Sequence, residues 1–215
     1  MKEFDRNFFS GTYSNKKYVD LGLNVHWATS NVGAKNPEEF GEYYPWGVLT
    51  SFELLKMQSY DPRIISNLLS ARPSPILKDI SGTRYDIAKI YYGEESAWRT
   101  PRWEDFQELF MNTRTDVISI GEIIGYQFTS IINGNSIFLP AAGHFSQFAQ
   151  NYIDEVIEYW TSERYDGDDE PQTPQRGFGI SFYSDDPHVI SPAKVNVNTA
   201  MPIRPVLDSR ILQNR

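Results

Sequence analysis

Cysteine is absent from this chain of 215 residues. Its absence excludes disulfides, thiolate nucleophiles, cysteine-bound zinc and thiol redox chemistry together. Basic residues are also few, because 20 Lys and Arg stand against 28 Asp and Glu, for a formal net charge of -8. The sequence has no cluster of Lys and Arg of the kind that phosphate binding needs, so its charge argues against nucleic acid as a partner.

Long apolar runs are missing too, and none approaches the length of a membrane span. The first residues, MKEFDRNFFSGTYSNKKY, are polar and lack the apolar core of a signal peptide. Two locations stay open on this basis: the cytoplasm, or the outside of the cell after removal of an export segment. The sequence also lacks a nucleophile elbow, a phosphate loop and an HExxH motif.

Aromatic residues, in contrast, are abundant at 14% of the chain. Aromatic side chains in such numbers favour a β-rich core, because flat rings fill pleated surfaces well. Apolar residues of one parity from Val19 to Trp27 predict a strand, which Gly22 can bend into two short ones. Residues 36–41, NPEEFG, predict a short helix with Asn36 as N-cap and Gly41 as the stop.

The clearest predicted helix follows Pro101, where Trp103, Phe106, Leu109 and Phe110 share one apolar stripe. Residues 48–85 have a poor pattern and are interpreted as an irregular insert.

Residues 125–139 predict a hairpin with a type I′ turn at Asn133-Gly134. Further strands are predicted at 159–160, at 178–183 and in the final stretch KVNVNTAMPIRPV. Strands with two helices in the N-terminal half predict an α+β fold with an antiparallel sheet.

Five blocks of the chain resemble one family. They are YVDLGLNVHWATSNVGAKNPEEFGEYYPWG, WRTPRWEDFQEL, GYQFTSIINGNSIFLPAAG, YWTS and IRPV, and they extend from Tyr18 to Val206. Together they resemble the major paralogous domain of FISUMP type, found in surface and secreted proteins of gut bacteria. That family is similar in turn to the C-type lectin-like fold and to the sulfatase-modifying enzymes that generate formylglycine.

The resemblance implies a C-type lectin-like fold with paired terminal strands, two helices and a long irregular loop region that carries binding. It implies a single domain at 18–206, preceded by an N-terminal extension at 1–17 and followed by a tail at 207–215. In such a fold the small residues Pro140-Ala141-Ala142-Gly143 lie where the sheet meets the loop region, and they let another backbone approach closely. The chain departs from the family pattern at Ser30, at Arg102 and in the glycine-free segment 144–158.

Two loop segments, 144–158 and 163–177, are the predicted binding region. Its aromatic candidates, which either anchor a ligand or pack in the core, are Phe145, Phe148, Tyr152 and Tyr165. Asp166 and Asp168 are predicted to contribute polar contacts to the same ligand.

The acidic stretch ERYDGDDEPQ supplies oxygen atoms that could hold calcium. The candidate ligands are Asp166, Asp168, Asp169 and Glu170. The stretch lacks the full twelve-residue calcium loop, so we expect these carboxylates to be solvated and the protein to need no metal or other cofactor.

Arg99 and Arg204 lie inside apolar blocks, and we predict that each meets a carboxylate or several carbonyls.

The resemblance favours a non-enzymatic module that recognises a glycan or a surface protein, without nucleic acid and without a membrane span. An assembly subunit of a surface appendage and a carboxylate-dependent hydrolase are the alternatives. Sulfatase-modifying chemistry is excluded, because it depends on cysteine. A surface or extracellular location is what the resemblance implies, and the cytoplasm stays open.

Overall fold

The computed structural model describes residues 4–51, 77–146, 149–164, 176–183 and 191–213. Within these residues it contains four small sheets and three helices. Every strand pairing given for the sheets is antiparallel. The predicted α+β class with antiparallel sheets is therefore confirmed.

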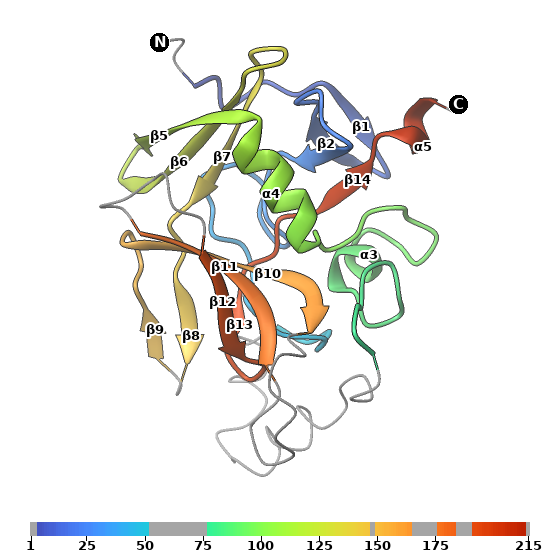
Figure 1. Ribbon diagram of the computed structural model, residues 1–215, viewed down its shortest axis with the longest axis vertical. Coiled ribbons are helices and arrows are strands. Elements are labelled where there is room, and N and C mark those ends of the chain that lie inside the picture. The colour runs from blue at the N-terminus through green and yellow to red at the C-terminus, as the bar shows by residue number, and fades with distance from the viewer. Residues whose placement is uncertain (1–3, 52–76, 147–148, 165–175, 184–190, 214–215) are drawn as a thin grey trace.

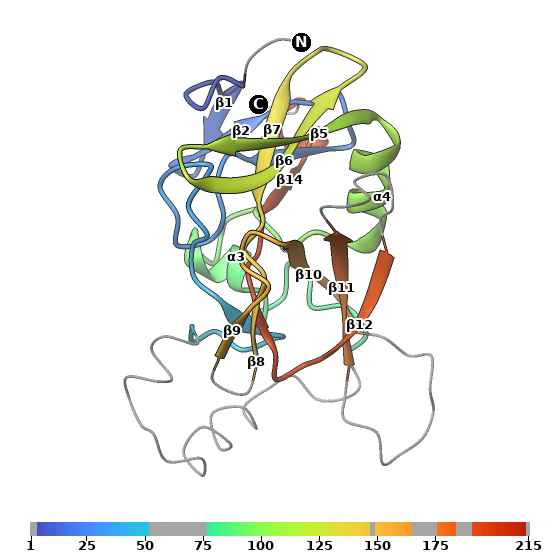
Figure 2. The ribbon, with the colours of Figure 1, turned by 90° about the vertical axis from the view of Figure 1, so that its left-hand side faces the viewer.

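The first sheet joins the two ends of the chain. It contains, in spatial order, β1 (Gly11–Tyr13), β2 (Lys16–Val19), β3 (Val25–Ala28) and β14 (Val206–Asp208). Gly22, with a φ of 74°, lies between β2 and β3 and divides the predicted strand into two. Both marked ends of the chain lie at the end of the molecule that carries this sheet (Figures 1 and 2).

The two segments expected to flank the domain contain several of these elements. β1 and the first residues of β2 lie within the 1–17 extension. Most of β14, and the short helix α5 (Arg210–Gln213) after it, lie within the 207–215 tail. Both segments thus contribute to the ordered elements of the fold.

The second sheet contains the predicted hairpin and follows the clearest predicted helix. β5 (Thr113–Ile120), β6 (Ile123–Ser130) and β7 (Ser136–Pro140) pair in that order, and α4 (Trp103–Met111) leads directly into β5 (Figure 1). Phe106 and Leu109 are each 1% exposed, and Trp103 and Phe110 are partly buried against the same core. The apolar stripe of α4 therefore faces the core, as predicted. The strand β5 was not predicted.

The other two sheets extend toward the opposite end of the molecule (Figure 2). One contains β10 (Val156–Arg164), β11 (Arg176–Tyr183) and β12 (Ser191–Asn196). The other contains β4 (Tyr44–Pro45), β13 (Ala200–Met201), β8 (His144–Ser146) and β9 (Ala149–Asn151). The helix α3 (Ile87–Tyr91) begins after Asp86, whose carboxylate accepts the N–H of Ala88 at 3.0 Å.

The helix predicted at residues 36–41 is wrong, because the segment forms a turn. The Glu39 carboxylate accepts the N–H of Lys35 at 2.8 Å and the side-chain amide of Asn36 at 2.7 Å. Gly41 then takes a φ of 75° and reverses the chain. The residues between Asn36 and Gly41 are too few to repeat the helical hydrogen bond, so the local side-chain bonds determine the structure.

The hairpin is confirmed, but its predicted two-residue turn is wrong. Its loop covers residues 131–135, and of the Asn133-Gly134 pair only Gly134 takes a positive φ. The side-chain amide of Asn133 donates to the carbonyl of Asp20 at 3.0 Å, and the N–H of Ile131 donates to the carbonyl of Asn112 at 3.0 Å. Contacts with distant segments thus override the local turn preference of Asn-Gly.

The final predicted strand is also divided. β12 ends at Asn196, where a turn closes through the bond from the Thr199 N–H to the Asn196 carbonyl at 2.8 Å. β13 and β14 follow, separated by a stretch that contains Pro202 and Pro205. Proline has no N–H to donate to a strand ladder, which explains the interruption.

The strip Pro140–Gly143 carries the chain from the second sheet to β8 (Figure 1). The carbonyl of Ala141 accepts the N–H of Asp154 at 2.8 Å, and the N–H of Gly143 donates to the carbonyl of Val156 at 3.0 Å. A Cβ at Gly143 would lie 2.0 Å from the carbonyl oxygen of Asn151. The close backbone approach predicted for this strip is therefore present.

Replacing Gly143 by Ala tests that close approach, and Gly134 provides the matched control. Both glycines have positive φ, 55° and 77°, but a Cβ at Gly134 would have no atom within 4 Å. We expect Gly134→Ala to lose about 1 kcal/mol of unfolding free energy from backbone strain alone. Gly143→Ala should lose about 1–3 kcal/mol more, because it adds a steric clash. Equal losses in urea denaturation would contradict the role assigned to the strip.

Candidate functional site

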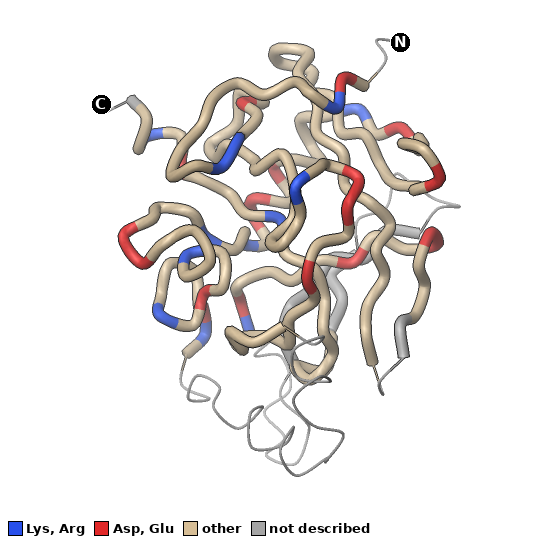
Figure 3. Tube along the Cα trace, turned by 180° about the vertical axis from the view of Figure 1, so that it is seen from behind, with Lys and Arg blue, Asp and Glu red and all other residues tan. Residues whose placement is uncertain are grey.

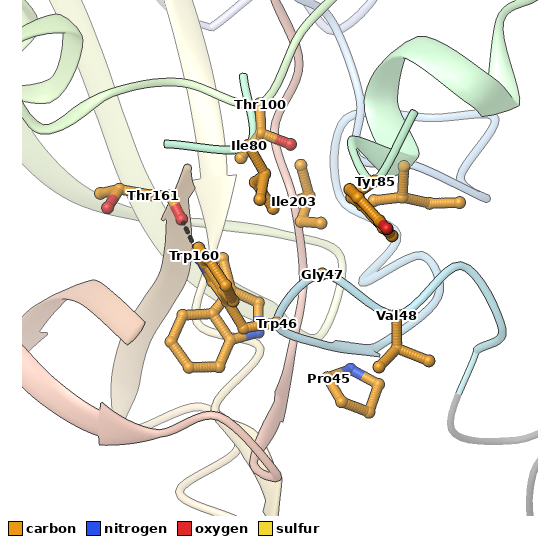
Figure 4. Close-up of a pocket in the computed structure, with 11 residues that line it drawn as sticks. Pro45, Trp46, Gly47, Val48, Ile80, Tyr85, Thr100, Trp160, Thr161 and Ile203 are labelled. Carbon is orange, nitrogen blue, oxygen red and sulfur yellow. Dashed lines mark hydrogen bonds between the residues drawn. The ribbon is translucent and has the colours of Figure 1, made fainter. Parts of the chain in front are cut away.

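The enclosed pocket beside the Trp160 indole does not have the dimensions of a ligand site (Figure 4). Trp46 and Trp160 lie along it, and Tyr85 lies across it. The indole N–H of Trp46 donates to the carbonyl of Thr161 at 3.1 Å. The cavity volume is only about 10 Å³, which is about the space of one water molecule. Its tryptophans belong to the buried core.

Phe145, the first of the aromatic candidates, lies on β8 and is half-buried. Its ring meets the ring of Tyr43 edge to face, with centroids 4.8 Å apart and planes at 87°. The hydroxyl of Tyr43 in turn donates to the carbonyl of Ala142 at 2.6 Å. Phe145 therefore anchors β8 onto the Pro140–Gly143 strip with one side of its ring.

Tyr152, the second candidate, lies immediately after β9 and is 54% exposed. Its φ is 58°, in the left-handed region that side chains seldom adopt. The ring lies 5.6 Å from the imidazole of His144, with an angle of 51° between the planes. The Nδ1 of His144 is hydrogen-bonded to the carboxylate of Glu158 on β10. An exposed ring, an imidazole and a carboxylate thus form a continuous group, which we call the Tyr152 cluster.

Backbone hydrogen bonds fix the turn that presents Tyr152. Its carbonyl accepts the N–H groups of Glu155 at 3.3 Å and Val156 at 3.1 Å. The side-chain amide of Asn151 donates to the hydroxyl of Ser146 across the β8–β9 pair at 3.0 Å. The segment 144–158, expected to be irregular, therefore contains two paired strands and a closed turn.

The other predicted binding residues lie outside the described part of the chain. These are Phe148, Tyr165, Asp166 and Asp168, together with Asp169 and Glu170 of the calcium hypothesis. Within the described ranges, no group of three or more His, Asp or Glu side chains is placed to hold a metal ion.

A second polar group lies at the start of α4 and was not predicted. The carboxylate of Glu163, on β10, accepts the N–H of Trp103 at 2.9 Å. Arg102 donates its backbone N–H to the Asp105 carboxylate at 2.6 Å. Carboxylates from β10 and from the first turn of α4 therefore accept N–H groups at the start of this helix.

Burial raises the pKa of Glu163 to about 7, and the neighbouring carboxyl group of Glu104 contributes to the same shift. The bond from the Trp103 N–H opposes the shift, because it stabilises the charged form. Asp79 lies opposite Glu163 in an isolated bridge and accepts the Arg102 Nε–H at 2.8 Å. This group can exchange a proton near neutral pH, but no sequence pattern connects its members, which come from three separate segments.

Both arginines predicted to need partners have them. Arg99 binds the carboxylate of Asp105 through both terminal nitrogens, at 2.6 and 3.0 Å. Arg204 is fully buried and donates to the carbonyls of Ala28 and Thr29 at 3.1 and 3.0 Å. On the face seen from behind, basic and acidic positions are interspersed and do not gather in one basic patch (Figure 3).

No protein-family model, curated protein or solved structure matches the chain. Among the described residues, no helix is both long enough and apolar enough to span a membrane.

Replacing Glu163 by Gln should change how stability depends on pH. The folded chain holds the Glu163 proton more tightly than the unfolded chain, whose pKa is near the ordinary 4.5. Stability therefore falls as the pH rises from about 4.5 to about 7, and the glutamine variant lacks this fall. Because Gln can still accept the Trp103 N–H, we expect a gain of about 1–2 kcal/mol at alkaline pH and little change at low pH.

Unfolding by urea at a series of pH values measures this effect. Glu155→Gln is the control, because Glu155 is exposed on the turn before β10. A parallel pH dependence in wild type and Glu163→Gln would show that Glu163 ionises normally.

Proposed function

We propose that the protein is a non-enzymatic binding module that recognises a glycan, or else a surface protein, through the end of the molecule that carries β8 and β9. The Tyr152 cluster is the recognition surface. The observation that carries the proposal is a tyrosine, Tyr152, that is 54% exposed beside a hydrogen-bonded His144–Glu158 pair. An exposed ring offers an apolar face to a ligand, and the pair beside it offers directional polar contacts.

The position of the ring in the fold supports this proposal. Tyr152 is tied by backbone bonds to β10 and by Gly143 to the Pro140–Gly143 strip, so its place does not depend on its own side chain. A ligand that stacks on it therefore meets a surface that is already ordered, which lowers the entropy lost on binding. Glycans fit this chemistry, because a pyranose has one apolar face and a rim of hydroxyl groups.

The proposed fold is C-type lectin-like, and the proposed family is the FISUMP type. Support comes from the antiparallel sheets, from the pairing of β3 with the C-terminal strand β14, and from the small residues at 140–143. Because proteins of that family are found at the cell surface or are secreted, we propose the same location for this protein. No cofactor is part of the proposal.

Replacing Tyr152 by Ala should remove binding without unfolding the protein. A glycan array first identifies a ligand, and calorimetric titration then measures its affinity. We expect a loss of about thirtyfold or more, the level of an aromatic hot spot. Tyr91→Ala is the matched control, because Tyr91 is 49% exposed on α3. Affinity that survives in Tyr152→Ala, or is lost equally in Tyr91→Ala, would place the site elsewhere.

A second candidate function is that of an assembly subunit, and an exposed apolar patch favours it. Met111, Ile131 and Ile132 are 77%, 63% and 56% exposed. The bond from the Ile131 N–H to the Asn112 carbonyl at 3.0 Å brings the hairpin loop against the end of α4. Apolar side chains gathered in this way are typical of a contact with another protein. Analytical ultracentrifugation over a range of concentrations separates this function from that of a monomeric binding module.

The hydrolase alternative has one supporting observation, the raised pKa of Glu163 beside Glu104. The Glu104 carboxyl group is close enough to Glu163 to contribute to this shift. Glycosidase carboxyl pairs are about 5 Å or more apart, to leave room for the sugar.

A further inference from the structure

Two buried cations without an acidic partner lie near each other at the C-terminal end of β3. Arg204 is fully buried and Lys16 is 8% exposed. Among the described residues, neither side chain forms an ion pair with a carboxylate. A buried cation without a countercharge is costly, so a fold that keeps two of them together needs compensation.

One short segment of backbone brings the two cations together. Arg204 donates to the carbonyls of Ala28 and Thr29 at 3.1 and 3.0 Å. The Lys16 ammonium donates to the hydroxyl of the next residue, Ser30, at 2.6 Å. These bonds satisfy only part of the donors, because an ammonium has three N–H groups and a guanidinium has five.

The Nε of Arg204 donates to the side-chain carbonyl of Asn31 at 2.7 Å, but two other polar groups of the cluster have no partner in the described part of the chain. The Nη2 of Arg204 and the hydroxyl of Tyr92 are both buried without a hydrogen bond among the described residues. The Lys16 nitrogen lies 5.3 Å from the centroid of the Tyr92 ring. Buried polar groups of native proteins are nearly always paired, so unpaired donors within one cluster indicate a bound group that accepts hydrogen bonds.

We propose that Lys16, Tyr92 and Arg204 form a site for a small monovalent anion, of the size and charge of chloride. Every unpaired group in the cluster is a hydrogen-bond donor, so the site excludes metal cations and matches an ion that only accepts. A charged acceptor is favoured over a water molecule, because it also supplies the missing countercharge. The ion is small, because Lys16, Arg204 and the hydroxyl group of Tyr92 are buried.

The pH dependence of binding follows from the charges that face Lys16. Burial and, to a smaller extent, the nearby charge of Arg204 lower the pKa of Lys16 to about 7, whereas Glu39 acts in the opposite direction. The Glu39 carboxylate is hydrogen-bonded to Lys35 and Asn36 and does not contact the ammonium. Lys16 therefore carries its charge below about pH 7, and the anion should bind more tightly at pH 6 than at pH 8.5.

Chlorine NMR tests this site on the whole chain with chloride itself as the probe. A bound chloride ion in fast exchange broadens the bulk signal, and competition with bromide removes the broadening from a saturable site. We expect wild type to show saturable broadening that is stronger at pH 6 than at pH 8.5. Lys16→Met should abolish it, whereas Lys17→Met, a control at the neighbouring exposed position of β2, should leave it unchanged.

A second, smaller substitution tests the site with less risk of unfolding the protein. Tyr92→Phe removes only the unpaired hydroxyl and should weaken chloride binding about tenfold, the worth of one hydrogen bond to a charged group. Circular dichroism confirms that each variant is folded. Equal broadening in wild type, Lys16→Met and Tyr92→Phe would contradict the proposed site. A wild-type protein without saturable broadening would also contradict it, because water alone would then occupy the space.

Discussion

The position of Arg204 is the constraint on which the rest of this structure depends. The residue lies in the segment that connects β13 to β14, its side chain is fully buried, and its Nε donates to the side-chain carbonyl of Asn31 at 2.7 Å. The amide of Asn31 then donates to the Phe40 carbonyl at 2.8 Å and to the Tyr159 hydroxyl at 3.1 Å. One cation therefore connects the C-terminal segment, the loop after β3 and the strand β10. Removing it would leave several buried acceptors unpaired, which costs more than the loss of one side chain.

The need for such a connection could be predicted, although its partners could not. An arginine inside the apolar block Ile203–Val206 must be hydrogen-bonded wherever the chain places it. The partners, Ala28, Thr29 and Asn31, lie more than 170 positions earlier in the chain and carry no charge that would mark them. Sequence reasoning identifies a buried charge from its neighbours, but backbone carbonyls are the same at every residue and give no signal.

Elements with a strong repeating pattern were predicted well. The stripe of α4 specifies which face is buried, because packing and local preference agree there. Where contacts with distant segments compete with local preference, the prediction from local sequence is wrong. The pair Asn133-Gly134 is typical of a two-residue turn, but the side-chain amides of Asn133 and Asn135 both donate to the Asp20 carbonyl and stabilise a wider loop. The turn at residues 36–39 fails as a helix for a similar reason, since its side chains bind their own backbone.

The candidate site likewise contains residues that the sequence indicated and residues that it did not. Aromatic and irregular composition pointed to residues 144–158, and Tyr152 there is an exposed ring on an ordered turn. The same reasoning could not separate it from Phe145, whose ring packs on Tyr43, because both are aromatic residues in one polar segment. It also missed His144 with Glu158, and Trp103 with Glu163, because members of each pair lie on different elements.

The backbone of Tyr152 gives a reason to assign the exposed ring a function. Four described non-glycine residues have positive φ, namely Ser14, Asn15, Tyr152 and Asp154. Short polar side chains such as those of Asn and Asp tolerate this conformation by bonding locally, whereas a tyrosine adopts it at a cost of about 1 kcal/mol or more. Burial does not offset that cost, because more than half of the side chain is exposed. Asparagine or glycine would fit the turn with less strain, so this backbone conformation supports the proposal that the ring contacts a ligand.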